Sequence, residues 1–230
     1  MDIPQADMRV NTVQLIVHDV EAIVQKGLMF QSEIIEIAAI RVRLESGQLK
    51  PEDTFHTYVE PQSVTSIPVT TTKLTGITQA QVERAGQFPE VMERFLAWLG
   101  SDEYFLCSWS LSDRDYFIAD CKRHNLSLDW IRNYNDIQRW FGQVQRLEKR
   151  TSLKRAMEML QIAPEGQEHS ALVDAQHTLQ VLLRIFNPDS PVFTLERNDC
   201  SGVYQTEVVY EEEFHNNPFA ALKDVLGQSE

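Results

Sequence analysis

In several short stretches of the chain, branched apolar residues run together or alternate with polar ones, as they do in β-strands. These predicted strands cover residues 13–17, 33–44, 54–60 and 104–107 and a short stretch near Tyr134. Other stretches repeat apolar residues every three or four positions, as amphipathic helices do. These predicted helices cover residues 89–99, 113–124, 152–160 and 172–186. The order of the elements predicts an α/β fold, a mixed sheet with helices on both sides, in which Gly47 and Pro51 mark the turn between the second and third strands.

The pattern changes after residue 186. The sequence NPDSP that follows is typical of a boundary, and residues 187–230 carry nine acids and two bases. We therefore expect a main domain at 1–186 and a short acidic C-terminal extension at 187–230, partly ordered or docked on the domain. Residues 217–226 could form an amphipathic helix that docks on its own domain or binds a protein partner; disorder is the third alternative.

Composition fits one globular domain. A length of 230 residues and a hydrophobic content of 43% suit a well-buried core. No apolar run approaches the ~18 residues of a membrane span, and no signal-peptide pattern begins the chain, so we expect no membrane association. Cys107, Cys121 and Cys200 show no metal-binding spacing and are interpreted as free thiols of a reducing compartment. We expect a cytoplasmic protein.

Two acids follow the first predicted strand. Side chains alternate along a strand, so Asp19 and Glu21 point the same way. His18 points to the opposite face and is expected to pack there or to form a local hydrogen bond. Two converging acids repel each other unless a cation lies between them. A divalent-ion site therefore competes with the plainer interpretation, a pair of solvated acids in a turn.

A histidine and an acid flank the start of the last predicted helix. Ser170 suits the N-cap of this helix, with Asp174 near the first turn and His169 just ahead of it. A helix N-terminus favours anions such as phosphate. The alternative is that His169 is an ordinary surface histidine. That is the interpretation we give to His124 and His177, which lie in polar helical contexts.

A fourth acid, Asp113, begins the helix predicted at 113–124. Its alternative role is that of a helix N-terminal acid, in which Ser112 or Asp113 caps the helix, and Asp115 is the second candidate for the functional position. Together the fragments supply four carboxylates and one imidazole. Mg²⁺ and Mn²⁺ prefer oxygen ligands, and two such ions can activate a water and stabilise the leaving oxygen of a displacement at phosphorus. A nearby histidine can accept the proton of the attacking water.

The sequence resembles the DEDDh family of 3′–5′ exonucleases. The fragments Asp-x-Glu at 19–21, an acid after a strand at 113, and His-x-x-x-x-Asp at 169–174 occur in the order of that family's three motifs. The segments EIIEIAAIRV, TTKLTGIT and WSLSD make the chain most similar to the branch of small-interfering-RNA and histone-mRNA 3′ exonucleases. The resemblance covers residues 10–186 and implies a ribonuclease-H-like fold.

The same resemblance implies a role for each residue of the set. Asp19, Glu21 and Asp174 would hold the catalytic metal ion. Asp19 would also reach a second ion, to which Asp113 binds directly or through water. His169 would be the general base for the attacking water.

The resemblance also implies contacts with the substrate. The backbone around Ala22 would lie against the terminal 3′ hydroxyl. Ile23 stands where the family usually has Thr, so one hydroxyl contact is lost. Met29 and Phe30 could wedge against the terminal base, although core packing explains them equally well. The basic segment at 146–155 could hold the backbone of a longer substrate, and a solvated helical face is the alternative.

We therefore expect a metal-dependent 3′–5′ exonuclease that releases nucleoside 5′-monophosphates from the 3′ end of a single-stranded nucleic acid, with RNA as the expected substrate and two ions of Mg²⁺ or Mn²⁺ as cofactors. A DNA exonuclease is one alternative, because such a metal site ignores the 2′ hydroxyl. A catalytically silent nucleic-acid-binding or scaffold relative is another, but it would have no chemical need for His169. The net charge of −13 disfavours binding to a polyanion. Residues 187–230 account for much of that charge, and two divalent ions would neutralise four of the remaining acids.

Overall fold

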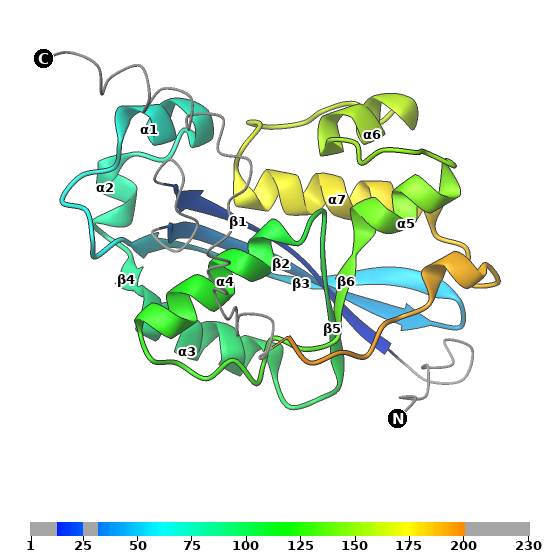
Figure 1. Ribbon diagram of the computed structural model, residues 1–230, viewed down its shortest axis with the longest axis horizontal. Coiled ribbons are helices and arrows are strands. Elements are labelled where there is room, and N and C mark those ends of the chain that lie inside the picture. Colours follow the sequence, from blue (N-terminus) through cyan, green and yellow to red (C-terminus); the bar gives the residue numbers. More distant parts are fainter. Residues whose placement is uncertain (1–12, 25–31, 201–230) are drawn as a thin grey trace, which may run out of the picture.

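A computed structural model of the protein describes residues 13–24 and 32–200. Six strands form one sheet in the order β4-β3-β2-β1-β5-β6 (Figure 1). They are β1 Val13–Ile23, β2 Glu33–Glu45, β3 Gln48–Glu60, β4 Gly86–Gln87, β5 Tyr104–Ser108 and β6 Tyr134–Asp136. Strands β1, β2 and β3 pair antiparallel, whereas β5 runs parallel to β1 and β6 parallel to β5. The predicted α/β fold with a mixed sheet is confirmed.

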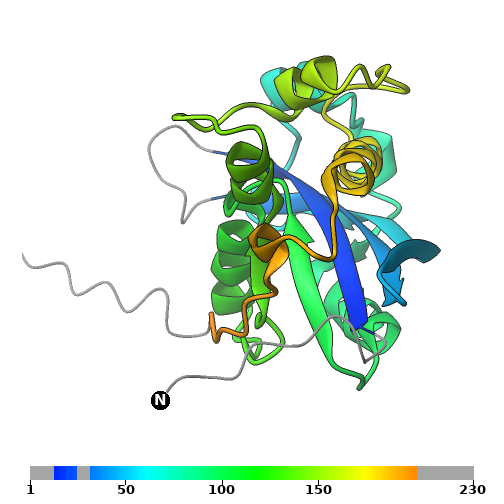
Figure 2. The same ribbon diagram turned by 90° about the vertical axis from the view of Figure 1, so that its right-hand side faces the viewer.

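Helices cover both faces of this sheet. They are α1 Val69–Thr75, α2 Gln79–Val82, α3 Phe88–Leu99, α4 Ser112–Arg123, α5 Ile137–Val144, α6 Leu153–Met159 and α7 Ala171–Ile185. Helix α7 crosses one face over β1 and β2, with α5 and α6 packed against it, while α3 and α4 lie on the other face (Figures 1 and 2). Within the described ranges, no helix has both the length and the apolar character to cross a membrane.

Strand β1 lies inside the sheet, and its side chains alternate between two cores. Leu15 and Val17 belong to the apolar cluster under α5, α6 and α7. Ile16 and Val20 belong to the cluster under α3 and α4. All four side chains are buried. The period-two pattern of the sequence therefore sorts β1 into an odd-numbered face toward α7 and an even-numbered face toward α4.

The hairpin between β2 and β3 is tighter than predicted. Ser46 and Gly47 both have positive φ, 51° and 75°, and form a two-residue turn, which requires that backbone conformation. Pro51 lies inside β3, opposite Val42 and beside an irregularity in the register, where a residue without an N–H is tolerated. The prediction that Pro51 marks the turn is wrong, and β3 begins six residues earlier than expected.

Residues 187–200 lie against the domain. The Phe193 side chain is 1% exposed, and its ring contacts those of Trp140 and Phe186 at centroid distances of 5.8 and 5.3 Å. The Asn198 side chain accepts a hydrogen bond from the Tyr134 N–H at 2.8 Å and donates one to the Tyr134 carbonyl at 2.9 Å. This part of the predicted C-terminal extension therefore contributes to the apolar core and to the edge of the sheet at β6.

Some predictions concern residues outside the described ranges. Met29 and Phe30, the predicted contacts to a terminal base, lie there, and so does the possible amphipathic helix at 217–226. Where the domain boundary falls stays a prediction.

Candidate active site

The two acids of β1 lie on the face of the sheet that α7 covers. Asp19 and Glu21 continue the odd-numbered alternation of Leu15 and Val17, and both are partly buried. The register with β2 shifts directly after Glu21, where Ala22 pairs with Ile34. The two acids therefore point the same way, as the Asp-x-Glu spacing predicts, and they do so within a strand, not in a turn.

His18 lies on the opposite face, as expected. Its side chain is 1% exposed and packs edge-on against the rings of Phe117 and Tyr134, at centroid distances of 5.7 and 5.4 Å. Burial lowers its pKa to about 3. Neither ring nitrogen has a hydrogen-bond partner in the described part of the chain, so His18 packs there as a neutral ring.

Asp113 lies near Asp19 of β1, although it comes from α4 on the opposite face of the sheet from α7. It lies in the first turn of α4, directly after β5, and is 6% exposed. Burial raises the pKa of its carboxyl to about 7, and interactions with the Val20 backbone and the Ser108 side chain oppose that rise. The N-cap position of α4 is occupied by Leu111 without any side-chain cap, so Asp113 does not cap this helix. Asp115, the second candidate, forms an ion pair with Arg114 at 2.9 Å instead.

His169 and Asp174 are brought to β1 by the N-terminus of α7. Asp174 lies in the first turn of the helix, and His169 lies in the loop before it, exposed, with a left-handed backbone at φ 62°. That conformation is uncommon for a residue other than glycine and is often found at functional sites. One ligand atom from each of Glu21, His169 and Asp174 lies within 4.8 Å of the other two. The first and third predicted motifs therefore meet in space.

Burial raises the pKa values of all four acids, and repulsion within the group adds to the rise at Asp19, Glu21 and Asp113. Burial is the largest cause for Asp19, whose pKa lies well above its usual value, and the charge of Asp113 is the next. Burial and then the charge of Asp174 raise the pKa of Glu21 to about 9. Burial also raises the pKa of Asp113 and of Asp174. Such a group stays ionised at neutral pH only beside compensating cations, and its carboxylate oxygens fit Mg²⁺ or Mn²⁺.

A fifth acid, Glu36 on β2, lies beside this group and was not singled out from the sequence. Its side chain is 1% exposed, and it pairs directly with Glu21 across the two strands. Its charge adds to the causes that raise the pKa of Asp19 and Glu21. The available signal was a lone acid inside the apolar run EIIEIAAI, where a buried charge requires a partner.

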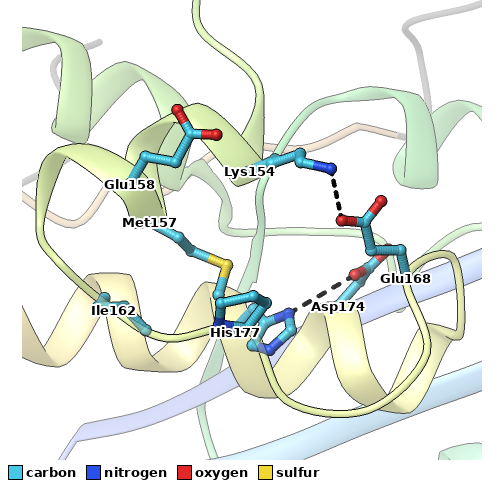
Figure 3. A pocket seen from close by; sticks show the side chains of 8 residues that line it. Lys154, Met157, Glu158, Ile162, Glu168, Asp174 and His177 are labelled. Carbon is cyan, nitrogen blue, oxygen red and sulfur yellow. Dashed lines mark hydrogen bonds and ion pairs between the residues drawn. The ribbon is translucent and has the colours of Figure 1, made fainter.

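His177 is not an ordinary surface histidine, so that prediction is wrong. Its side chain is only 4% exposed. Together with Met157 and Ile162, it lines a cavity of about 90 Å³ between α6 and α7 (Figure 3). Nε2 accepts a hydrogen bond from the Glu165 N–H at 3.2 Å, and Nδ1 lies 3.9 Å from Oδ1 of Asp174. His177 therefore contacts both the loop that carries His169 and a residue of the acidic group. His124 is partly exposed and stacks on Phe88.

The predicted substrate contacts near β1 are only partly accessible. Ala22 is partly exposed. The Ile23 side chain is 2% exposed and packs with Ile35 and Ile77 in a third apolar cluster. Because Ile23 as a whole is buried, only Ala22 of these two residues is exposed to a substrate.

Much of the basic segment at 146–155 is engaged by the domain itself. Arg150 bonds to Asp136, Lys154 to Glu168, and Arg155 to Glu158, at 3.0, 2.7 and 2.9 Å. Figure 3 shows the second of these pairs beside Asp174. These three charges favour the alternative of an exposed helical surface over a site that holds the substrate backbone.

The fold and the site together define a class. A mixed sheet that carries two acids on a central strand and meets an acid and a histidine from the last helix is the ribonuclease-H-like arrangement of DEDDh nucleases. A family model described as Exonuclease matches residues 16–182. The chain belongs to this family, the DEDDh 3′–5′ exonucleases.

The chain is similar to several known members. 3′-5′ exoribonuclease 1 of Rattus norvegicus is 30% identical over 180 residues, which are 73% of this chain and 51% of that protein. ERI1 exoribonuclease 2 of Danio rerio is 33% identical over 175 residues, 66% of this chain and 31% of that protein. The chain thus spans about half, or less, of these relatives. The nuclease domain of 3′hExo, a DEDDh family member solved with bound rAMP, superimposes with a TM-score of 0.69 at 25% identity, covering 82% of this chain and 98% of that one.

Proposed function

We propose that this protein is a metal-dependent 3′–5′ exonuclease that hydrolyses the terminal phosphodiester bond of single-stranded RNA and releases nucleoside 5′-monophosphates. The observation that carries the proposal is the convergence of three groups: the acids of β1, the acid at the start of α4, and the acid and histidine at the N-terminus of α7. The choice of RNA is supported by the similarity to proteins named exoribonucleases.

Four carboxylates would hold the ions. Asp19, Glu21 and Asp174 would bind one, and Asp113 together with Asp19 would bind the other. When bound, divalent ions at such a site supply Lewis-acid activation of a water and neutralise charge on the leaving oxygen. The raised pKa values of Asp19 and Glu21 support this assignment, because a bound cation would offset the repulsion among the acids.

The histidine would move the proton. His169 is exposed, so it can reach a substrate and exchange its proton with solvent, and its ring lies beside Glu21 and Asp174. It would accept the proton of the attacking water as that water adds to phosphorus. The backbone of Ala22, which is partly exposed, would face the terminal 3′ hydroxyl, which explains why a free 3′ end would be required.

The activity is tested with 5′-labelled single strands of RNA and DNA of the same sequence, incubated with Mg²⁺ or Mn²⁺. RNA should shorten stepwise from its 3′ end, and a 3′-phosphate should slow the reaction. Faster shortening of DNA would reassign the substrate. Cleavage of a circular strand would contradict the 3′–5′ polarity. Metal binding without cleavage of either strand would favour the silent relative.

The role of the histidine is tested separately. His169→Ala should lower kcat by roughly 10²–10⁴-fold, the usual range for loss of a positioned general base. His124→Ala is the matched control, because His124 is the C-cap residue of α4, stacked on Phe88 at the opposite end of that helix from Asp113, and should stay near wild type. Equal rates for the two variants would remove His169 from the mechanism.

A further inference from the structure

We infer that Glu36 is a positioning residue, which fixes the N-terminus of α7, and with it His169 and Asp174, against the acids of β1. This inference rests on the proposed function and names a residue that acts through others. Neither the sequence motifs nor the metal-ligand set includes it.

Glu36 uses both carboxylate oxygens. Oε2 accepts a hydrogen bond from the backbone N–H of Ala171 at 2.9 Å. Oε1 lies 2.7 Å from Nε2 of His56 on β3, and the hydroxyl of Ser170 donates to it at 3.4 Å. The carboxylate is therefore held from two sides, by β3 and by the start of α7, and it is shielded from water.

This contact replaces the helix cap that the sequence predicts. The first N–H groups of a helix lack partners within it and need an acceptor. Ser170 occupies the N-cap position of α7, but its side chain makes no capping hydrogen bond there. The acceptor is instead the carboxylate of Glu36, 135 residues earlier in the chain, and its negative charge also suits the helix dipole.

The position of this cap gives it a functional consequence. Ala171 stands two residues after His169 and three before Asp174, so its N–H fixes the helix end that bears both. Glu36 in turn pairs with Glu21 across β1 and β2. The Glu36 carboxylate thereby holds the start of α7, with the third motif, next to the strand that carries the first motif. Loss of a contact that orients metal ligands commonly changes metal affinity or activity by 10–100-fold.

Two substitutions separate the effect of the length of the Glu36 side chain from the effect of its charge. Glu36→Gln keeps the length of the side chain and an oxygen that can accept the Ala171 N–H, but it loses the charge. Glu36→Asp keeps the charge but is one methylene shorter and does not reach. We expect Glu36→Gln to keep most of the wild-type kcat and Mn²⁺ affinity, and Glu36→Asp to lose about 10–100-fold in kcat with a smaller change in KM.

The matched control is Glu33→Asp on the same strand. Glu33 is also buried and accepts backbone N–H groups, from Gln62 and Ser63 at 2.9 and 3.0 Å, on a different side of the domain from α7. Its shortening should lower the melting temperature without lowering the kcat of the folded protein. A fall in kcat equal to that of Glu36→Asp would overturn the inference, because any buried acid of β2 would then have the same effect.

Hydrogen exchange gives a readout independent of activity. The backbone amides at 171–174 should exchange faster in Glu36→Asp than in wild type, and at the wild-type rate in Glu36→Gln. If Glu36→Gln is the impaired variant and Glu36→Asp is not, the charge matters and the positioning role is refuted. Should wild type bind Mn²⁺ but cleave nothing, the proposed function fails, while the exchange and Mn²⁺ measurements still test Glu36.

Discussion

Replacing Glu21 by Gln should stabilise the protein when metal is absent. The Glu21 pKa is about 4.5 in an unfolded chain and is raised to about 9 in the folded state by burial and by Asp174. Between these two values the folded state binds one more proton than the unfolded state. The free energy of unfolding therefore falls as pH rises through this window. Gln does not titrate, so the free energy of unfolding of the Glu21→Gln variant should not fall in this way as pH rises.

The size of the effect follows from the spacing of the site. Glu21 and Asp174 oxygens lie within 4.8 Å, and two unit charges at that distance repel by about 3 kcal/mol at an effective dielectric constant of about 20. If Glu21 is protonated in the folded state, its protonation at pH 8 costs at most about 5 kcal/mol. This figure is the distance from the unfolded pKa of about 4.5 to pH 8, at 1.36 kcal/mol per pKa unit. We therefore expect a gain of about 3 kcal/mol in EDTA, or roughly 6–12 °C in melting temperature for a chain of this size.

Thermal unfolding in EDTA at pH 5 and pH 8 measures this gain. The difference between variant and wild type should be small at pH 5, large at pH 8, and reduced when Mg²⁺ or Mn²⁺ is added, because the variant has lost a ligand. Glu93→Gln, which removes an exposed charge on α3, should change little under any of these conditions. A Glu21→Gln variant no more stable than wild type at pH 8 would refute the idea of a strained acidic group.

Three further outcomes are expected. Asp19→Asn should abolish turnover and keep a native circular-dichroism spectrum, and EDTA should silence the wild type reversibly; wild-type rates from Asp19→Asn in Mg²⁺ would exclude it as a ligand. Phe193→Ala should lower the free energy of unfolding by about 3–5 kcal/mol in urea titrations, whereas Leu183→Ala, at a side chain 42% exposed, should cost below about 1 kcal/mol. A chain ending at residue 186 should melt well below one ending at residue 200, since only the longer chain keeps Phe193; equal melting temperatures would show that residues 187–200 add no stability.

The pattern of apolar residues predicts those features of the fold that depend only on neighbouring residues in the sequence. The alternation along β1 predicts a buried strand with Asp19 and Glu21 on one side and His18 on the other, and the structure shows this arrangement. The bounds of α3 and α7 agree with the predicted helices to within one residue. In each case the period of the apolar residues is set by the element itself.

Features that depend on distant parts of the chain are not visible in such patterns. His177 is buried because α6 packs over that side of α7, which no short window of sequence reveals. Glu36 caps a helix 135 residues away, so Ser170 was the natural local choice for the N-cap. Asn198 pairs with Tyr134 across the edge of the sheet for the same kind of reason. These contacts form only when the tertiary structure is complete.

The strict alternation of β1 limits how this gene can vary in length. The odd-numbered side chains of β1 face α7, and the even-numbered ones face the apolar cluster beneath α4. Inserting a single residue between Val17 and Asp19 would therefore point Asp19 and Glu21 into that cluster. No substitution elsewhere could restore them to α7. Codon gains and losses within Val13–Ile23 should therefore be far more damaging than most single replacements there, while length changes beyond either end of the strand leave its register intact.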